Sequence, residues 1–434
     1  MHFGLEGFVP LTMYFGAILA FILSIFWKPQ IGLYYLVPIL PLQTIRYRVH
    51  YLPLGEKLVD ILLLGILIGL FFRKERPMFL STPLDRILFV FVGLTYLSLW
   101  QGAFYLGGSL PLSILDPRFS DWKNYVEMMF LFVIVAATIR SPKQIKIVLF
   151  LMCFSVLFIN RSFHNSVGSR DLSGGYSDDL RVGGVLGYAG ENGMAAFQAE
   201  FAVLLIGLAP CVRNRTGRWG LLALACTCVY CLVFTFSRGG YVGFLAGILV
   251  LGLISSRKLL LVLLVILIGW QSIVPNAVRE RVLMTYNEAE GLESSAQERV
   301  DIWQDALDVI RSNPVTGTGF DTYQFMKRVG PYTDTHNYYL KVLLEMGIAG
   351  LLCFLSLLKV AGKMSWQLFR SAKDPFLKAL GGSFLSVIAC AMTVNLFGDR
   401  WTLLQVNAFF WILLGCVARG LVFIRQEEQS TPLN

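Results

Sequence analysis

The chain has 434 residues, of which 56% are hydrophobic and 15% are charged, with a mean hydropathy of +0.63. Soluble domains carry roughly 25% charged residues, so this composition excludes a soluble domain and predicts an all-α integral membrane protein. The formal net charge of +9 does not by itself indicate an acidic partner, because membrane proteins carry excess Lys and Arg on their cytoplasmic side. We therefore expect the lipid bilayer as a partner and no nucleic acid.

Apolar runs of bilayer-spanning length recur along the chain and predict about 12 transmembrane helices in one polytopic domain, residues 1–434. The first run lacks the cleavage pattern of a signal peptide, so we expect it to be retained. The shorter run 31–43 contains Pro38 and Pro41, and is a thirteenth span, a half helix or a re-entrant segment. The twelve runs cover residues 11–27, 58–72, 87–106, 124–139, 146–160, 195–210, 219–236, 241–254, 259–274, 338–360, 378–397 and 402–424.

Short loops dense in Lys and Arg fall at alternate connections, which places them in the cytoplasm by the positive-inside rule. Two of the loops that then face outward are long. The first, 161–194, is rich in Gly, Ser and Asp and predicts irregular chain over a cavity; the second, 275–337, is larger. The outward segments are 107–122, 161–194, 237–240, 275–337 and 398–401.

The large outward loop contains an amphipathic helix of its own. Ser295 and Glu298 have the spacing of a capping box, and Asn313-Pro314 ends the helix. The apolar positions at helical spacing are Val300, Trp303, Leu307 and Ile310. Such a helix lies on the membrane surface or caps a cavity.

Arg238 stands at the outward start of a span, in Ser-Arg-Gly-Gly at 237–240. An arginine there either snorkels to the lipid headgroups or binds an anion. The neighbouring glycines favour the second interpretation, because they let the backbone approach a ligand closely. Gly239, Gly243 and Gly247 form a small-residue face that suits tight helix packing.

Two further candidates lie in the first long loop. Arg181 offers a planar fork of donors that matches phosphate oxygens, although an ion pair with Asp178 or Asp179 is the more ordinary interpretation. Asn192 precedes an apolar run, where it is a helix cap or a ligand contact.

His336 lies just before the span that starts near residue 338. Asp334 or Thr335 is a plausible N-cap, which puts His336 in the first helical turn. The positive end of the helix dipole disfavours imidazolium there, so the ring is expected to be neutral and able to accept a proton. A lone histidine is more often structural, but this one lies at the outward membrane boundary.

Several charged residues have simple local explanations. Lys341 and Glu345 have i,i+4 spacing and can satisfy each other, and Arg400 can pair with Asp399 or contact an anion. No ATP-binding loop, metal-binding cluster or zinc-type cysteine spacing is present in the sequence, so we predict no cofactor and no metal.

Taken in order, these motifs resemble the O-antigen ligase and O-antigen polymerase superfamily, and the resemblance covers roughly residues 180–350. The motifs are Ser-Arg-Gly-Gly at 237–240, the loop helix, Asn-Pro-x-x-Gly-x-Gly at 313–319, Thr-His-Asn at 335–337 and Glu-x-Gly-x-x-Gly at 345–350. The chain is also similar to the O-glycosylation ligases associated with exosortase systems. It departs from the family at 190–193, where Gly-Glu-Asn-Gly replaces Asn-Pro-Asn.

The resemblance implies a GT-C-like membrane glycosyltransferase in the bacterial inner membrane, with its active site facing the periplasm. It would move a glycan from undecaprenyl diphosphate to an acceptor hydroxyl of a lipid A core sugar, with inversion and without a metal. Arg181 and Arg238 would hold the diphosphate and His336 would act as general base. The expected substrate contacts are Ser237, Asn192, Asn337 and Arg400.

Three alternatives stay open from the sequence. A polymerase would use another lipid-linked glycan repeat as acceptor, and a protein O-oligosaccharyltransferase would use a protein hydroxyl. A polyprenyl-lipid flippase or anion transporter would bind phosphate in transit, but it would need a polar path to the other side or an internal repeat, and neither is visible.

Overall fold

The computed structural model describes residues 8–73, 79–113, 115–168, 170, 175–284, 286–287, 291–292, 294–329 and 333–430. These residues form an all-helical bundle with one two-stranded hairpin of two residues per strand, Tyr286–Asn287 and Gly291–Leu292. The all-helical class predicted from composition is confirmed for this part of the chain.

The helices follow the predicted apolar runs closely. Each of the twelve runs coincides with one helix. The long helices are α1 (Phe8–Phe26), α4 (Leu58–Phe72), α5 (Asp85–Leu106), α6 (Pro117–Thr138), α7 (Pro142–Val167), α8 (Gly190–Leu208), α9 (Arg215–Val233), α10 (Arg238–Ile254), α11 (Lys258–Ile273), α13 (Ser294–Ser312), α15 (Tyr338–Ser371), α16 (Pro375–Val394) and α17 (Leu404–Ser430). The shorter ones are α2 (Pro29–Ile39), α3 (Gln43–Tyr47), α12 (Asn276–Leu283) and α14 (Tyr323–Met326).

Eight helices among the described residues are long and apolar enough to cross a membrane, or up to nine if the pair α11 and α12, bent by 110°, counts as one span. The chain is therefore a multi-pass membrane protein, but the number twelve is not confirmed. The 15 residues of α4 and the 17 residues of α10 are short for a full crossing. The segment 31–43 contributes α2, whose 11 residues extend over only about 16 Å.

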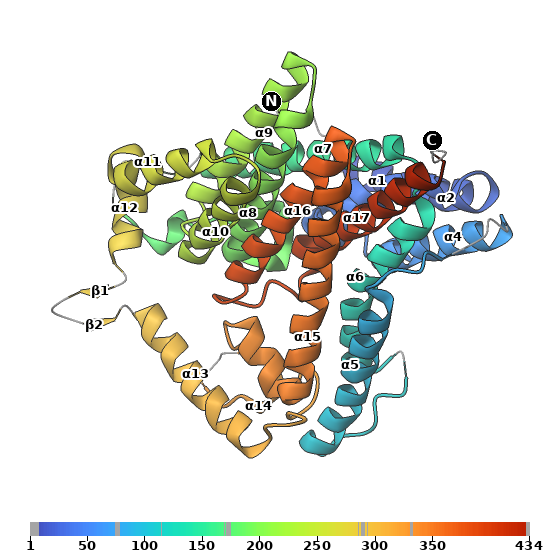
Figure 1. Ribbon diagram of the computed structural model, residues 1–434. Helices are drawn as coiled ribbons and strands as arrows, with labels where there is room; N and C mark the ends of the chain where they lie inside the picture. The colour runs from blue at the N-terminus through green and yellow to red at the C-terminus, as the bar shows by residue number, and fades with distance from the viewer. Residues whose placement is uncertain are drawn as a thin grey trace.

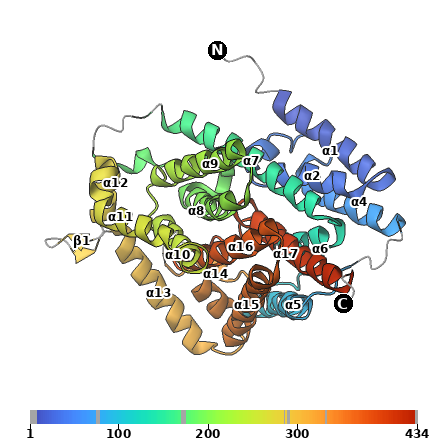
Figure 2. The same cartoon turned by 45° about the horizontal axis from the view of Figure 1, so that its top comes forward.

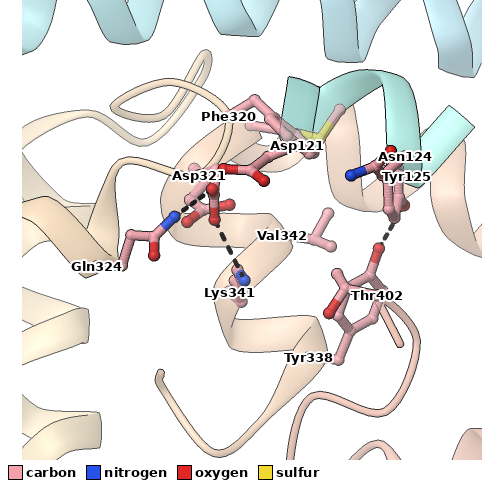
Figure 3. Close-up of a pocket in the computed structure, with 12 residues that line it drawn as sticks. Asp121, Asn124, Tyr125, Phe320, Asp321, Gln324, Tyr338, Lys341, Val342 and Thr402 are labelled. Atoms are coloured by element: carbon pink, nitrogen blue, oxygen red, sulfur yellow. Dashed lines mark hydrogen bonds and ion pairs between the residues drawn. The ribbon is translucent and has the colours of Figure 1, made fainter. Parts of the chain in front are cut away.

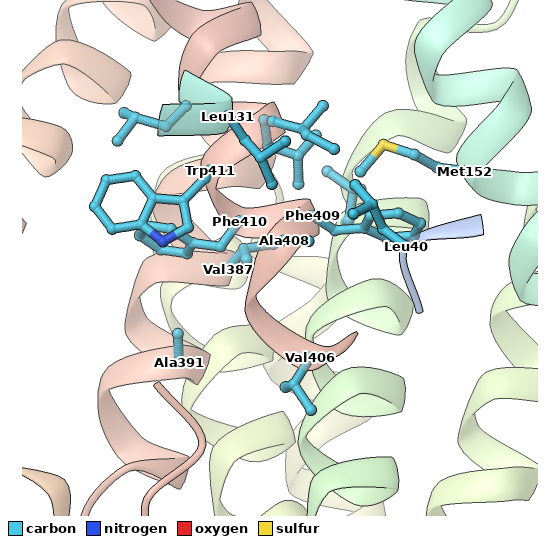
Figure 4. Packing of buried hydrophobic residues seen from close by; sticks show 14 of the residues in the cluster. Leu40, Leu131, Met152, Val387, Ala391, Val406, Ala408, Phe409, Phe410 and Trp411 are labelled. Carbon is cyan, nitrogen blue, oxygen red and sulfur yellow. The ribbon is translucent and has the colours of Figure 1, made fainter. Parts of the chain in front are cut away.

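The bundle is organised around α8, α16 and α17. Helix α16 packs against α8, α10 and α15, and α17 packs against α6 (Figure 1). Helices α1, α2 and α4 pack on one another and occupy one side of the molecule (Figure 2). Trp411 and Phe410 of α17 are almost fully buried among apolar side chains of the neighbouring helices (Figure 4). This rigid bundle carries the loops that form the site.

The predicted amphipathic helix is α13, which packs on protein. Ile302, Ala306 and Val309 are buried against Tyr323 and Leu344, whereas Leu307, expected on the apolar face, is 44% exposed. The apolar face is rotated from the expected one because it fits the first turns of α15. The helix was expected to lie on the membrane surface or to cap a cavity. In the structure it packs against α14 and α15.

The N-terminal end of α13 differs from the prediction by a small shift. The helix begins at Ser294, so Ser295 does not precede it as an N-cap would. The side chain of Ser295 lies outside the described residues. The helix ends at Ser312, as Asn313-Pro314 predicts.

Helix α15 is broken at Gly347, where the backbone has φ 62° and ψ −168°. The turn at 313–319 packs into this break: Ile348 N donates to Pro314 O at 3.0 Å, and Thr318 N donates to Leu344 O at 3.0 Å. A Cβ on Gly347 would come within 2.1 Å of Val315 O. The two glycine motifs of the resemblance, 313–319 and 345–350, therefore pack directly against each other through their backbones.

The substitution Gly347→Ala should destabilise the protein, because the residue has a positive φ and its new Cβ would collide with the 313–319 backbone. Overpacking of this kind costs about 1–3 kcal/mol, and the strained φ adds to it. The measurement is the thermal unfolding midpoint in detergent. Gly93→Ala in α5 is the control, since a Cβ there has no neighbour within 4 Å; an equal midpoint for both variants would contradict this packing.

Candidate active site

A cavity of about 70 Å³ lies where α8 and α10 begin. Five arginine side chains and no carboxylate line it, so its charge is strongly positive. We call it the arginine cavity. Its lining residues are Arg181, Asn192, Phe236, Ser237, Arg238, Gly239, Gly240, Arg281, Arg299, Val394, Phe397 and Arg400. Of the seven predicted site residues, the structure brings five into this one cavity.

The start of α10 forms one wall of the arginine cavity. Arg238 is the first residue of the helix, and the two glycines after it pack closely on other helices. A Cβ on Gly239 would come within 2.8 Å of Phe397, and one on Gly240 within 2.6 Å of Ala195. The predicted tight packing of this small-residue face is confirmed. The unpaired N–H groups of a helix N-terminus add positive potential to the cavity.

Asn192 joins two sides of the cavity. Its Oδ1 accepts hydrogen bonds from Arg181 Nη2 at 3.0 Å and from Ser237 Oγ at 2.7 Å. The N-cap of α8 is Ala189, so the interpretation of Asn192 as a cap is wrong. This asparagine fixes the guanidinium of Arg181 relative to the start of α10.

The ordinary interpretation of Arg181 is also wrong. Its guanidinium lies 4.0 Å from Glu191 and bonds Asn192, and no ion pair joins it to Asp178 or Asp179 among the described residues. Its Nε has no partner in that part of the chain. The tertiary fold thus turns Arg181 away from its sequence neighbours and into the cavity.

Arg400 reaches the cavity because its neighbour Asp399 is occupied elsewhere. Asp399 accepts from Lys341 Nζ at 3.1 Å and from Thr402 Oγ1 at 2.8 Å. Among the described residues, the local pair Asp399–Arg400 expected from sequence does not form between the side chains, and the guanidinium of Arg400 donates to the Asp399 backbone carbonyl. The expected Lys341–Glu345 pair is wrong for the same reason, since Lys341 binds Asp399 and Asp321.

Two arginines of the cavity escaped the sequence analysis. Arg281 is 7% exposed and its guanidinium lies over the ring of Tyr176 at 4.7 Å. Arg299 comes from α13, one turn before Trp303. Arg299 sits at the edge of the amphipathic pattern, a position that could have drawn attention to it. Nothing local marks Arg281, because the packing that selects it is tertiary.

The five guanidinium groups repel one another. Burial first, and then the charges of the four other arginines, lower the pKa of Arg299. Burial is also the main cause that lowers the pKa of Arg400. A site that holds this much like charge favours a multivalent anion, which relieves the repulsion and accepts bidentate hydrogen bonds.

His336 precedes the helix that was expected to contain it. The N-cap of α15 is Asn337, whose Oδ1 accepts from Leu340 N at 3.1 Å, so the assignment of the cap to Asp334 or Thr335 is wrong. His336 has a φ of 52°, an uncommon backbone conformation for a non-glycine residue. Trp303 Nε1 holds this loop by donating to Thr335 O at 3.0 Å.

The electrostatic surroundings of His336 favour the neutral form of its ring. Burial is the largest cause that lowers its pKa below the ordinary value, and the charges of Arg299 and Arg400 lower it further. Asp334, whose Oδ2 lies 3.6 Å from His336 Nδ1, acts in the opposite direction, as does Glu298. The neutral ring stays a prediction, and burial and the arginines, which lower the pKa of His336, favour it in place of the helix dipole.

The remaining predicted contact, Asn337, lies at the cap of α15 and does not line the arginine cavity. Two acidic residues of the apolar helices α4 and α6 have a structural partner: Lys123 Nζ binds Asp60 at 2.7 Å and Glu127 at 3.1 Å. Glu200 lines a separate apolar cavity among phenylalanines of α8 and α17.

Comparison with known proteins supports the resemblance over part of the chain. Residues 222–355 match the family model described as O-Antigen ligase. The match includes Ser237, Arg238, Arg281, Arg299 and His336, whereas Arg181 and Asn192 precede it and Arg400 follows it. No curated protein gives a significant match to the chain.

His336 should titrate below the usual histidine value of about 6.5. NMR of protein with isotope-labelled histidine measures this, and His336→Gln identifies the resonance. Asp334→Asn should lower the pKa of His336 further, because it removes the negative charge that favours imidazolium. A higher pKa in Asp334→Asn would contradict the described electrostatics.

Inorganic pyrophosphate should bind the arginine cavity and stabilise the protein, by about 2.7 kcal/mol at a concentration 100 times its Kd. Arg299→Gln should weaken this binding about tenfold, since it removes a charged donor. Arg311→Gln is the matched control, because Arg311 belongs to the same helix but is exposed and paired with Asp308 at 2.7 Å. Thermal shift against ligand concentration gives both affinities, and equal losses in the two variants would argue against the cavity.

Proposed function

Because residues 222–355 carry an O-antigen ligase domain, we propose that the chain is a polyprenyl-diphosphate glycan ligase of the membrane. It transfers a glycan from undecaprenyl diphosphate to an acceptor hydroxyl of a lipid A core sugar, in one inverting step. The observation that carries this proposal is the convergence of five arginines beside a neutral histidine.

The arginine cavity suits the leaving group of this reaction. As the bond between the anomeric carbon and the phosphate oxygen breaks, negative charge grows on the diphosphate. Fixed guanidinium groups and helix N–H donors in a water-poor cavity stabilise that charge without reorganisation. In the proposed reaction they take the part that a divalent cation plays in other phosphate chemistry.

His336 suits the acceptor. A neutral imidazole can take the proton of the acceptor hydroxyl as the oxygen attacks the anomeric carbon. The carbon–oxygen bond forms on the face opposite the diphosphate, the old bond breaks, and undecaprenyl diphosphate leaves with the bonding electrons. The low pKa of His336 keeps the base form populated at neutral pH, and the positive φ of this residue is a strain that a site can retain for function.

We propose that the site faces the periplasm of the bacterial inner membrane. All five segments that the positive-inside rule groups outward contribute residues to the arginine cavity or to a second cavity, which is lined by Asp121 and Asp321 among others. Twelve crossings are compatible with this orientation if α4, α6, α10 and α11 also cross. In that arrangement α13 and α14 cover the periplasmic end.

The close rivals share this chemistry and differ in the acceptor. A polymerase would give a ladder of lipid-linked repeats, and a protein O-oligosaccharyltransferase would give a glycoprotein, whereas a ligase moves one assembled chain to a different lipid. A flippase or anion transporter is less favoured, because the two polar cavities of the described residues lie among loops of one side.

Transfer in proteoliposomes tests the proposal, with an undecaprenyl-diphosphate glycan as donor and lipid A core as acceptor. His336→Ala should lower kcat by about 10²–10⁴, because it removes the base. Arg238→Lys should lose much of the rate despite its retained charge, since lysine cannot form a bidentate pair. Full activity in His336→Ala, or loss of wild-type transfer on adding a chelator, would overturn the proposed mechanism.

A further inference from the structure

A second cavity, of about 320 Å³, has no role in the mechanism above. We call it the acidic cavity. It lies between α6, the 320–324 segment and the first turns of α15 (Figure 3). Its lining residues are Asp121, Asn124, Tyr125, Phe320, Asp321, Gln324, Tyr338, Lys341, Val342, Glu345, Met346 and Thr402. Small-molecule sites begin at about 300 Å³.

The charge of this cavity is opposite to that of the arginine cavity. Three carboxylates line it, Asp121, Asp321 and Glu345, against the single ammonium of Lys341. That ammonium is already engaged by Asp321 and by Asp399 behind the wall. A phosphate would be repelled here, so the acidic cavity suits a part of the substrate that is uncharged or carries an amino group.

The polar groups of the cavity include several hydrogen-bond acceptors. Glu345 is 3% exposed, and Tyr323 N donates to its Oε1 at 3.4 Å. Its carboxylate lies at the cavity wall. Asp121 and Asn124 project from α6 and make no hydrogen bond to the described residues. These carboxylate and amide oxygens are acceptors open to the cavity, and they suit a ligand rich in hydroxyl groups.

Aromatic side chains also line the cavity. The rings of Tyr125 and Phe320 lie 5.3 Å apart, and the hydroxyl of Tyr125 is 2.6 Å from that of Tyr338. A sugar ring has an apolar C–H face and a rim of hydroxyl donors. Aromatic rings and carboxylate and amide oxygens in one cavity complement both of these surfaces.

The two cavities are lined by residues that lie close together in the chain. His336 and Tyr338 are separated by one residue, with Tyr338 lining the acidic cavity; likewise Arg400 lines the arginine cavity and Thr402 the acidic one. An inverting displacement requires the nucleophile and the leaving diphosphate on opposite sides of the anomeric carbon. A sugar held in the acidic cavity would present its hydroxyl from outside the arginine cavity, as this requirement demands.

We propose that the acidic cavity is the subsite for the sugar ring that carries the acceptor hydroxyl. The assignment of this sugar as the acceptor rests on the proposed function. The binding of a sugar in the acidic cavity does not. Asp121 and Asn124 are then specificity-determining residues that orient the ring through its hydroxyl groups, and Glu345 accepts from a hydroxyl at the deep end.

The kinetic test separates the acceptor from the donor in the transfer assay. Asp121→Asn and Asn124→Ala should raise KM for the acceptor about tenfold or more, as loss of a hydrogen bond to a charged or buried group does, and leave KM for the donor unchanged. Both side chains are exposed at the cavity mouth, so the variants should fold. The control is Asp308→Asn, an exposed acid of α13, which should change neither constant.

A binding test that needs no turnover keeps the two proposals distinguishable. Titration calorimetry with methyl glycosides of neutral and 2-amino hexoses should show binding that Asp121→Asn weakens and Arg299→Gln does not, whereas pyrophosphate binding should respond in the reverse way. Hexose phosphates should bind the acidic cavity more weakly than the methyl glycosides.

Glycoside binding that depends on Asp121 in a protein that shows no transfer would refute the proposed function and keep the sugar subsite. A rise in the donor KM alone would assign the cavity to the donor glycan and overturn the acceptor assignment. Unchanged glycoside binding in both cavity variants would remove the subsite.

Discussion

The site depends on one backbone contact, the packing of the 313–319 turn into the break of α15 at Gly347. Neither segment has a side chain at its closest point, so the two backbones can exchange hydrogen bonds directly. Ser98 of α5 joins the same contact, since its carbonyl accepts from Phe320 N at 3.0 Å and its hydroxyl donates to Glu345 O at 3.1 Å. Three segments that are distant in sequence are thereby fixed together.

This contact determines where the chemistry lies. The end of the large loop and the first turns of α15 are held against α5, which sets the position of the 333–337 loop. Trp303 of α13 then secures that loop through Thr335. His336 is therefore placed by a chain of contacts that begins where Gly347 meets the 313–319 turn. Helix α13 brings Arg299 to the arginine cavity as part of the same assembly.

The two cavities carry opposite charges. The arginines are gathered from five separate segments of the chain, and the carboxylates of the acidic cavity come from three. Asp399 affects the charge of both cavities. Its carboxylate binds Lys341 and so neutralises the one cation that lines the acidic cavity. The same carboxylate does not pair with the Arg400 guanidinium, which adds a positive charge to the arginine cavity. A diphosphate-linked sugar, anionic at one end and polar but neutral at the other, matches this division.

The sequence was sufficient for features with a local cause and insufficient for those with a tertiary one. Composition and apolar runs predicted the helices, and the Ser-Arg-Gly-Gly turn and Arg181 could be singled out by their chemistry. The cap of α15 was misplaced because Asp334, Thr335 and Asn337 are all good capping residues, and contacts from Trp303 select among them. Arg281, Arg299 and the acidic cavity were missed because their partners are distant in sequence.

The density of positive charge in the arginine cavity has a consequence for turnover. In the proposed reaction the lipid product keeps the same diphosphate as the donor and gains a further ionisable oxygen where the sugar was attached. Coulomb attraction therefore holds the spent lipid at least as firmly as the donor. The features that favour bond cleavage would make departure of undecaprenyl diphosphate the slow event of the cycle. The turnover rate of such an enzyme would then depend on how quickly undecaprenyl diphosphate is removed and recycled in the membrane.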